Sequence, residues 1–521
     1  MGANENAASL PLPAFLEPKV ALDLDGRIVY VDSRSVSDAH LITWQARNKA
    51  LGFDFKIIAK EMQEIVALRN EGFTGVEVGD AHIGQDVRKA AIDMILDATR
   101  YQASDIHVML RGQFTEVQLA IKDHLRVLRQ FTHDEGDAIL RAIYQGIATV
   151  RDASFNRLQF QNAQIAGSVF NPSDGINNIR IVSGPCYPQD EGGAFMTMRL
   201  QYTPGFSPDI KKKLVPLEYP KRPKGVCRLE KMGYSPKQIE KLGMLMNVPS
   251  GMIIFTGPTG SGKTNSIFEL MQEIARSKPH KRQVTVEDPV EFPMPWAVQM
   301  AVTNAATERE TGEKFSECVR VMLRMAPHVM LFGEMRGPEV VVAALEASLT
   351  GHLIMATLHV TDPFAFVERF ELMDRRRIDR RVFCDSQQVR AIIGQRLIRR
   401  LCPHCSKPLA GHENEIGKRV LDALATWGSL DEVRIKGAGC EACSFDGDID
   451  RFAVAEIIIT DADLMADFIK NGTDVARSNY RKREDADLPI LDAVISHCLH
   501  GLIDPRNIED AADLIQPKTI N

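Results

Sequence analysis

The sequence predicts an α/β fold in which a parallel sheet is covered by helices on both faces. One observation is the stretch Gly251 to Thr264, GMIIFTGPTGSGKT, where an apolar run leads into a glycine-rich loop. A second is the regular alternation of strand and helix patterns beyond this loop, which is typical of parallel sheets. A third is the length of 521 residues, which is enough for about two to four domains with large cores.

The loop matches the pattern G-x-x-x-x-G-K-[ST], in which successive backbone N–H groups surround a polyphosphate. Met252 to Phe255 predicts a strand before the loop, and Asn265 to Ala275 predicts a helix after it, whose N-terminus adds positive charge. Lys263 should reach the β- and γ-phosphates, and the Thr264 hydroxyl should bind Mg²⁺. A chance glycine-rich turn is the alternative, but strand, loop and helix stand in the required order. The expected nucleotide-binding residues are Gly257, Pro258, Thr259, Gly260, Ser261, Gly262, Lys263, Thr264 and Asn265.

Composition limits the other classes of function. The formal net charge of -6 gives no general reason to expect nucleic acid or an anionic membrane as a partner. The N-terminus lacks the basic and apolar regions of a secretory signal, and no apolar run approaches the ~20 residues of a spanning helix. We therefore expect a cytoplasmic location, or a peripheral one at the membrane through a partner.

The N-terminal module is expected to be small. Alternating residues on either side of Asp25-Gly26 predict a hairpin, and residues 35 to about 70 show mostly helical periodicity, broken at Gly52. Residues 1 to about 15 resemble a loose tail. The whole predicted division is a module over 1–80, an α+β domain over 81–202, a Pro- and Lys-rich linker over 203–228, a nucleotide domain over 229–400, a cysteine-bearing subdomain over 401–450 and a C-terminal helical region over 451–521.

The larger domains show clear element patterns. Apolar residues at helical spacing predict a helix from Ile83 to Tyr101, and strands follow it up to Leu200. Ser235-Pro236 should begin the first helix of the nucleotide domain. After the phosphate loop we expect strand 283–287, helix 313–325, strand 328–333, helix 337–348, strand 352–358, helix 362–373, a helix from Gln387 to Arg400, a strand near 452–459 and short terminal helices.

Two C-x-x-C pairs, Cys402/Cys405 and Cys440/Cys443, are separated by 34 residues. Four thiolates suit a tetrahedral structural Zn²⁺ without an open catalytic position. A redox dithiol needs one pair and leaves the second unexplained. His404, inside the first pair, is expected to be a bystander.

Further motifs resemble those of the secretion ATPases that drive type IV pilus assembly and type II secretion. Five features stand in the family's order: the phosphate loop (Walker A), Val284 to Phe292 (an Asp box), Leu323 to Arg336 (Walker B), Thr350 to His359 (a His box), and the segment Gln387 to Arg400 with its two cysteine pairs. The resemblance implies a RecA-like nucleotide domain and a zinc insert.

Catalytic roles follow from this resemblance. Strand-end carboxylates beside a phosphate loop can orient water or hold Mg²⁺. Glu334 is favoured as the Walker B carboxylate and Glu287 as its partner in water activation, although the sequence leaves these two roles open, with Asp288 and Glu291 nearby. His359 would report the γ-phosphate with support from His352. The remaining expected catalytic residues are Lys263, and Arg180 and Arg199 of the preceding domain, which would reach the nucleotide when the domains close.

Two positions depart from the family. Pro327-His328 stands where Pro-Asp is usual, and Arg336-Gly337 where Arg-Asp is usual. Activity is still expected because Glu334 and Glu287 persist, with altered metal affinity or rate.

A run of arginines between residues 375 and 400 makes this segment basic, but little aromatic residue is interleaved with it. A solvated or intersubunit face is therefore preferred over a nucleic-acid surface.

The resemblance implies a motor that hydrolyses ATP, with Mg²⁺ and Zn²⁺ bound. It would form a homohexamer at the cytoplasmic side of the inner membrane and act on a platform protein of a pilus or secretion system, with no direct nucleic acid contact. The cysteines favour the assembly or secretion branch over the retraction branch. Alternatives are a conjugative or type IV secretion ATPase, a nucleic-acid motor, and a nucleotide-gated scaffold without hydrolysis.

Overall fold

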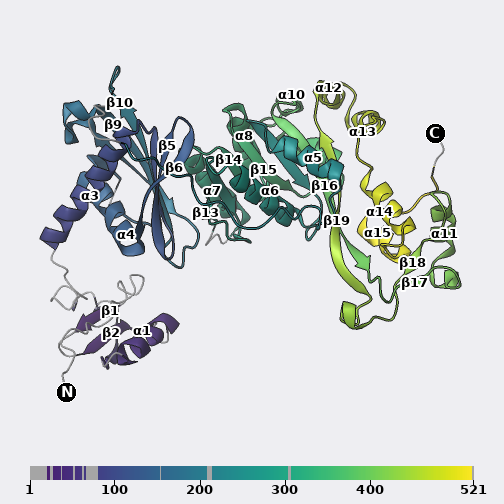
Figure 1. Ribbon diagram of the computed structural model, residues 1–521, viewed down its shortest axis with the longest axis horizontal. Coiled ribbons are helices and arrows are strands. Elements are labelled where there is room, and N and C mark those ends of the chain that lie inside the picture. The colour runs from purple at the N-terminus through teal and green to yellow at the C-terminus, as the bar shows by residue number, and fades with distance from the viewer. Residues whose placement is uncertain are drawn as a thin grey trace. The chain divides into compact units, whose positions relative to one another are not determined.

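A computed structural model gives the structure of the chain. It describes residues 20–23, 27–33, 35–36, 38–50, 53–61, 64–65, 68, 80–152, 154–207, 214–302 and 307–518. These belong to two compact units, Met1–Lys89 and Ala90–Asn521, and each is considered by itself (Figure 1). The predicted tail over residues 1 to 15 lies outside the described residues.

The first unit contains a small sheet. Strands β1 (Val20–Asp23) and β2 (Ile28–Asp32) pair antiparallel, which confirms the predicted hairpin, although Asp25-Gly26 itself lies outside the described residues. Helix α1 (Ala39–Ala50) leads to β3 (Lys56–Lys60), which pairs parallel to β2. The expected helical continuation is therefore wrong at β3. The β-branched residues of its Lys-Ile-Ile-Ala-Lys sequence suit a strand.

The second unit begins with an antiparallel sheet on which α4 packs (Figure 1). Alternation along the chain produces these strands, and the predicted strands up to Leu200 are confirmed. The strand order is β6-β5-β4-β10-β9-β8-β7. The elements are α3 (Asp80–Arg100), β4 (Asp105–Leu110), β5 (Phe114–Ile121), β6 (His124–Thr132), α4 (His133–Arg141), a π-helix (Ala142–Ile147), β7 (Val150–Arg151), β8 (Gln161–Ala166), β9 (Ile176–Pro185) and β10 (Ala194–Tyr202).

A second, mostly parallel sheet follows, with the strand order β13-β12-β14-β15-β11-β16-β19. Every neighbouring pair is parallel except β16 with β19, so the predicted parallel sheet is confirmed. Its elements are α5 (Pro236–Leu245), β11 (Gly251–Thr256), α6 (Lys263–Ser277), β12 (Gln283–Glu287), β13 (Ala297–Ala301), α7 (Glu308–Met322), β14 (Val329–Phe332), α8 (Pro338–Leu349), β15 (Leu353–Leu358), α9 (Phe366–Asp374), α10 (Arg380–Phe383), β16 (Val389–Leu401) and β19 (Asp448–Ile459).

Helices cover both faces of this sheet because neighbouring residues of β11 face opposite sides. Met252 and Ile254 pack in one apolar cluster with residues of α7 and α8. Ile253 and Phe255 pack in another with residues of α5 and α6. A strand that is buried on both faces in this way belongs in the centre of a three-layer α/β domain.

The prediction of a helix from Gln387 to Arg400 is wrong. This segment forms β16, which pairs with β11 on one side and with β19 on the other, from Ala391↔Ile459 to Leu401↔Asp448. Its apolar residues run almost continuously because the strand is buried on both faces. Such a run cannot be distinguished from a buried helix by periodicity alone.

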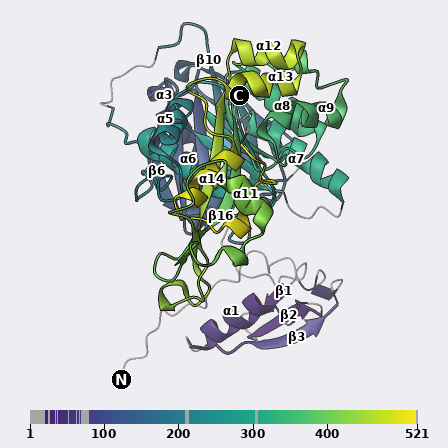
Figure 2. The same ribbon diagram turned by 90° about the vertical axis from the view of Figure 1, so that its right-hand side faces the viewer.

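The C-terminal elements divide between two places. Helices α12 (Ala462–Lys470) and α13 (Thr473–Arg481) pack on each other (Figure 2), and α12 contacts α9, where the rings of Phe468 and Phe366 are 5.5 Å apart. A separate apolar cluster near the far end of β16 and β19 includes residues of β18 (Arg434–Ile435), α11 (Lys418–Ala425), α14 (Ile490–Leu499) and α15 (Ile508–Ala511), and β17 (Lys407–Pro408) pairs with β18. Among the described residues, no helix combines the length and the apolar character that crossing a bilayer requires.

Candidate functional site

The glycine-rich loop connects the C-terminal end of β11 to the N-terminus of α6. The backbone takes positive φ at Gly257 (145°), Gly260 (77°) and Gly262 (80°), a region that side chains other than glycine rarely adopt. The Lys263 ammonium donates to the carbonyl oxygens of Gly257 and Pro258, both at 2.9 Å. Burial lowers the pKa of Lys263, and Glu334 opposes this shift. The loop thus holds a cation within its curve at a helix N-terminus, an arrangement suited to a polyphosphate.

The expected binding residues therefore lie together. Pro258, Thr259 and Gly260 are exposed, Ser261 is buried, and the predicted Mg²⁺ ligand Thr264 is half-buried in the first turn of α6. Asn265, beside it, is exposed. A hydroxyl at the start of the helix can reach a cation bound to the phosphates, so Thr264 fits the predicted role.

Glu287 ends β12, at the same edge of the sheet as the loop. Its side chain is 3% exposed, and its Oε1 accepts hydrogen bonds from Thr285 Oγ1 at 2.6 Å and Gln299 Nε2 at 3.0 Å. Burial raises the pKa of Glu287, and these two hydrogen bonds oppose the shift. A held carboxylate that accepts protons more readily than usual suits a general base.

Glu334 follows β14, the neighbour of β12. Its carboxylate forms an ion pair with Arg336, and its Oε1 lies 3.6 Å from Nε2 of His359, which follows β15. Arg336 also pairs with Asp288 at 3.1 Å. Burial and the charge of Lys263 lower the pKa of His359, and the charge of Glu334 opposes this shift. Three predicted residues (Lys263, Glu334 and His359) are thus brought together at the carboxyl edge of the sheet.

His352 lies at the other end of β15. Its Nδ1 is 3.0 Å from the carbonyl oxygen of Ala347 and 3.1 Å from Thr350 Oγ1, at the end of α8. A strand over Leu353–Leu358 separates it from His359 by about 23 Å of extended chain. His352 therefore does not support His359 by contact.

Arg180 and Arg199 are cross-strand neighbours on β9 and β10, and Asp105 of β4 lies opposite Arg199. The Arg199 Nε donates to Asp105 Oδ1 at 2.9 Å, whereas Arg180 is exposed. Within the described ranges, no hydrogen bond or ion pair joins either arginine to the phosphate loop. The two arginines are brought together with each other but not with Lys263.

The two residues that depart from the family pattern, His328 and Gly337, lie in different parts of the nucleotide domain. His328 lies just before β14, at the opposite edge of the sheet from Glu334. Its Nδ1 accepts the backbone N–H of Arg282 at 2.9 Å, and its Nε2 lies 2.9 Å from Asp123 Oδ1. Gly337 is the N-cap of α8, with extended backbone at φ -138° and ψ 167°. Neither position is an ion pair partner of Lys263 or Glu334 in the described part of the chain.

Sequence reasoning missed two polar residues of β16, Gln395 and Arg396. Gln395 is fully buried and donates from Nε2 to the carbonyl oxygen of Ser261, at 2.8 Å. Arg396 is 9% exposed and donates to the carbonyl oxygen of Thr361, at 2.7 Å. The only signal in the sequence is a polar pair inside an apolar run, Ala-Ile-Ile-Gly-Gln-Arg-Leu-Ile.

Most arginines of the basic segment are held by their own chain. Carboxylates pair with Arg377, Arg380, Arg381, Arg399 and Arg400, and carbonyl oxygens accept from Arg390 and Arg396. A guanidinium that is held in this way is less available to a phosphate backbone. This pairing favours the interpretation as a solvated or packing face.

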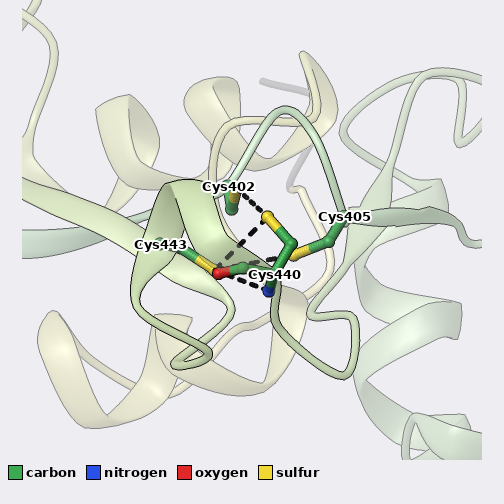
Figure 3. A group of neighbouring side chains, drawn as sticks. All are labelled: Cys402, Cys405, Cys440 and Cys443. Carbon is green, nitrogen blue, oxygen red and sulfur yellow. Dashed lines mark hydrogen bonds between the residues drawn. The ribbon is translucent and has the colours of Figure 1, made fainter.

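The four cysteines converge as predicted (Figure 3). Cys402 and Cys405 follow β16, and Cys440 and Cys443 flank a short turn before β19. All four sulfur atoms lie within 4.8 Å of one another, with 3.7 Å between Cys402 and Cys440 and 3.8 Å between Cys405 and Cys443. These separations are far longer than a disulfide bond of about 2.05 Å.

The donor set fits zinc. Sulfur atoms at about 2.3 Å from a tetrahedral Zn²⁺ lie about 3.8 Å apart, which matches the observed separations. The backbone N–H groups of Cys440 and Gly447 donate to Cys443 Sγ, both at 3.2 Å, and these bonds lower its pKa to about 6. Burial and the three neighbouring thiols raise the pKa of Cys405 to about 12, so forming its thiolate without a cation is unfavourable. A bound cation would stabilise the thiolate.

Known proteins resemble this chain over most of its length. A family profile described as "Type II/IV secretion system protein" matches residues 198–503. The type IV pilus assembly ATPase PilB of Thermus thermophilus is 28% identical over 397 residues, 76% of this chain and 40% of that protein. The type II secretion system protein HxcR of Pseudomonas aeruginosa is 27% identical over 388 residues, 74% of this chain and 69% of that protein.

Among solved structures, the ATPase DotB of Legionella pneumophila aligns with 80% of this chain and 94% of its own, at 19% identity and a TM-score of 0.38. The alignment with PilB leaves more than half of that relative's length unmatched. Since the family profile covers more than half of this chain, and its matched range holds the phosphate loop, the strand-end carboxylates and all four cysteines, the chain belongs to the type II/IV secretion system protein family.

Proposed function

We propose that the protein is a motor ATPase that powers type IV pilus assembly or type II secretion from the cytoplasmic side of the inner membrane. The observation that carries this proposal is the convergence of Lys263 in a curled glycine loop with Glu334 and His359 at the same sheet edge. Phosphoryl transfer needs charge neutralisation and an oriented water more than covalent chemistry. This edge offers groups for both.

The residues of this edge would divide the work. Lys263 would exchange its contacts with the Gly257 and Pro258 carbonyls for phosphate oxygens, and the loop N–H groups would bind the remaining charge. Thr264 would hold Mg²⁺, which neutralises the phosphates when bound. Glu334 would be the Walker B carboxylate and Glu287 would help to orient the water. Since His359 lies near Glu334, it would sense the γ-phosphate.

Arg180 and Arg199 would reach the nucleotide only after the α+β domain moves. The Arg199 side chain is 49% exposed, and its pair with Asp105 would have to break. An arginine supplied by domain closure couples hydrolysis to motion. This coupling is what a motor requires.

The remaining assignments extend the proposal. We assign a RecA-like fold to the nucleotide domain over 229–400, zinc to the four-cysteine cluster over 401–450, and a homohexamer as the working form. The modules over 1–80 and 81–202 would contact the membrane platform protein or neighbouring subunits, with residues 203–228 as the linker and 451–521 as the C-terminal region. Names of relatives from pilus assembly and type II secretion support this setting.

Phosphate release by the purified chain under Mg²⁺-ATP tests the proposal. Multiple turnover is expected, with loss in Lys263→Ala and Glu334→Gln. Glu339→Gln is a matched control, because this glutamate is exposed on α8 and pairs with Arg377. Absence of turnover with retained ATP binding would favour a nucleotide-gated scaffold, and stimulation by DNA would favour a nucleic-acid motor.

A further inference from the structure

Strand β16 extends beyond the end of β11, and this places two of its residues beside the phosphate loop. The pairing of β11 with β16 ends at Thr256↔Gly394, so Gln395 and Arg396 are level with the start of the loop. A Cβ at Gly257 would lie 2.4 Å from the Gln395 carbonyl oxygen, and one at Gly262 would lie 3.0 Å from Gln395 Nε2. Two glycines of the loop are thus pressed against one glutamine.

The Gln395 amide has a defined orientation. Its Oε1 accepts from the hydroxyls of Tyr234, at 2.6 Å, and Ser266, at 3.0 Å. Its Nε2 donates to the Ser261 carbonyl oxygen at 2.8 Å. The reverse orientation would place two oxygen atoms in contact, so the Ser261 carbonyl selects the observed one. All three partners of Gln395 are buried, and each hydrogen bond is therefore shielded from water.

The bond to Ser261 acts on the next residue through the peptide plane. In a trans peptide, the carbonyl of one residue and the N–H of the following residue point in opposite directions. Because Gln395 holds the Ser261 carbonyl toward β16, the N–H of Gly262 points away from β16. A phosphate-binding loop requires its N–H groups to point at the phosphates.

We propose that Gln395 is a positioning residue for nucleotide binding: it fixes the peptide between Ser261 and Gly262 so that the Gly262 N–H faces the phosphates. This role rests on the proposed function. Gln395 does not touch the phosphates itself. Tyr234 and Ser266 contact Gln395 and not the Ser261 carbonyl, so they act on this carbonyl only through the glutamine.

The test compares binding and turnover in the full-length chain. Gln395→Met removes every hydrogen bond of the amide at similar volume, and Gln395→Glu keeps the acceptor for the two hydroxyls but loses the donor to Ser261. Both variants should weaken Mg²⁺-ADP binding by about tenfold or more, because the Gly262 N–H would no longer be held for its hydrogen bond to a charged phosphate. KM for ATP should rise similarly while kcat changes less than about threefold, the pattern of lost uniform binding.

Two controls separate positioning from a general loss of stability. Tyr234→Phe removes a hydrogen bond from the same buried group but leaves the Gln395–Ser261 bond, so ADP affinity should change less than about threefold. Gln238→Met removes a half-buried amide of α5 that donates to the Ala455 carbonyl at 2.7 Å and to Asp487 Oδ2 at 2.9 Å and accepts the Ser235 N–H at 3.1 Å. None of these partners belongs to the loop, so this variant can lose stability but should leave affinity unchanged. Thermal unfolding is measured for all four variants.

Unchanged ADP affinity in folded Gln395→Met, or an equal loss in Tyr234→Phe, would overturn the positioning role. Equal losses in Gln395→Met and Gln238→Met would also overturn it, because a distant amide would then matter as much. A wild-type chain that fails to bind Mg²⁺-ADP would instead refute the proposed function.

Discussion

Loss of one cysteine should open the segments that carry the four cysteines while the nucleotide site survives. In Cys440→Ser, one of four converging sulfur atoms is removed from the cluster that joins the turn after β16 to the turn before β19. A metal there closes a loop of 38 residues, from position 402 to position 440. By the chain-entropy relation for cross-links, such a closure is worth at most about 4 kcal/mol, because the pairing of β16 with β19 already brings the ends of the loop near each other. Its loss would raise the population of the open form by at most about a thousandfold.

The rest of the molecule should tolerate this change. The apolar cluster of α11, α14 and α15 contains residues that do not depend on the metal, such as Leu424, Val494 and Ile503. The pairing of β16 with β19 runs from Leu401 back to Ala391 and remains intact. Opening should therefore be confined to the segments that carry the cysteines.

Zinc content, limited proteolysis and ADP affinity together check this expectation. Cys440→Ser should retain much less than one zinc per chain and be cleaved between residues 403 and 447, with ADP affinity within about twofold of wild type. Cys498→Ser is the matched control, because this cysteine is buried in the same apolar cluster but lies outside the metal group. One full equivalent of zinc in Cys440→Ser, or the same cleavage pattern in both variants, would refute the reasoning.

Three further predictions concern Glu287, Gly337 and His328. Burial raises the pKa of Glu287 above its ordinary 4.5, so the stability contributed by this carboxyl group is complete below pH 4.5 and is lost as the pH rises through the raised pKa. Across that pH range, the Tm of Glu287→Gln should therefore rise relative to the Tm of the wild type. Parallel plots of Tm against pH for the two proteins would contradict this prediction. Gly337→Asn supplies an N-cap side chain to α8, and the nearest described atom to an added Cβ is 3.7 Å away, so the side chain fits. This variant should raise Tm by about 1 °C, whereas the control Gly337→Ala, which supplies no capping oxygen, should not. His328→Asp places a carboxylate against Asp123, which is 76% exposed. The part of the Tm loss that is caused by this charge pair should correspond to at most about 1 kcal/mol and should disappear in high salt or in the Asp123→Asn background, whereas the part caused by removing the ring that accepts the Arg282 N–H should remain. A loss that neither salt nor Asp123→Asn reduces would rule out charge as a cause.

The parts of the fold that the sequence predicted are those with distinctive local patterns. The phosphate loop, α5 with its Ser235 cap and the strand-helix alternation need only a short window of sequence. The four-cysteine cluster was predictable because C-x-x-C spacing restricts the geometry of each pair. The errors fell on β3 and β16, where apolar residues carry no clear periodicity and pairing with distant strands decides the structure.

The site was predictable only in part for a related reason. Lys263, Glu334 and His359 belong to motifs that each follow a strand, so a parallel sheet brings them to one edge. Gln395 is 134 residues from its partner Ser261, and no pattern in either segment signals the other. The exposure of Arg180 and the pair of Arg199 with Asp105 depend on how antiparallel strands align, which the sequence does not specify.

The phosphate loop and the four-cysteine cluster are both next to the strand pair β16 and β19. β16 carries Gln395 beside the phosphate loop and leads directly into Cys402, while β19 begins shortly after Cys443. A metal at the cysteines would therefore clamp the open ends of β16 and β19, about 23 Å along the strand from Gln395. Because backbone pairing with β19 continues between these points, fraying at the cysteines would have to break many hydrogen bonds before it moved Gln395. A metal there would thus act on the shape of the insert, and the proposed role of Gln395 would act on the nucleotide, although a single strand bears both.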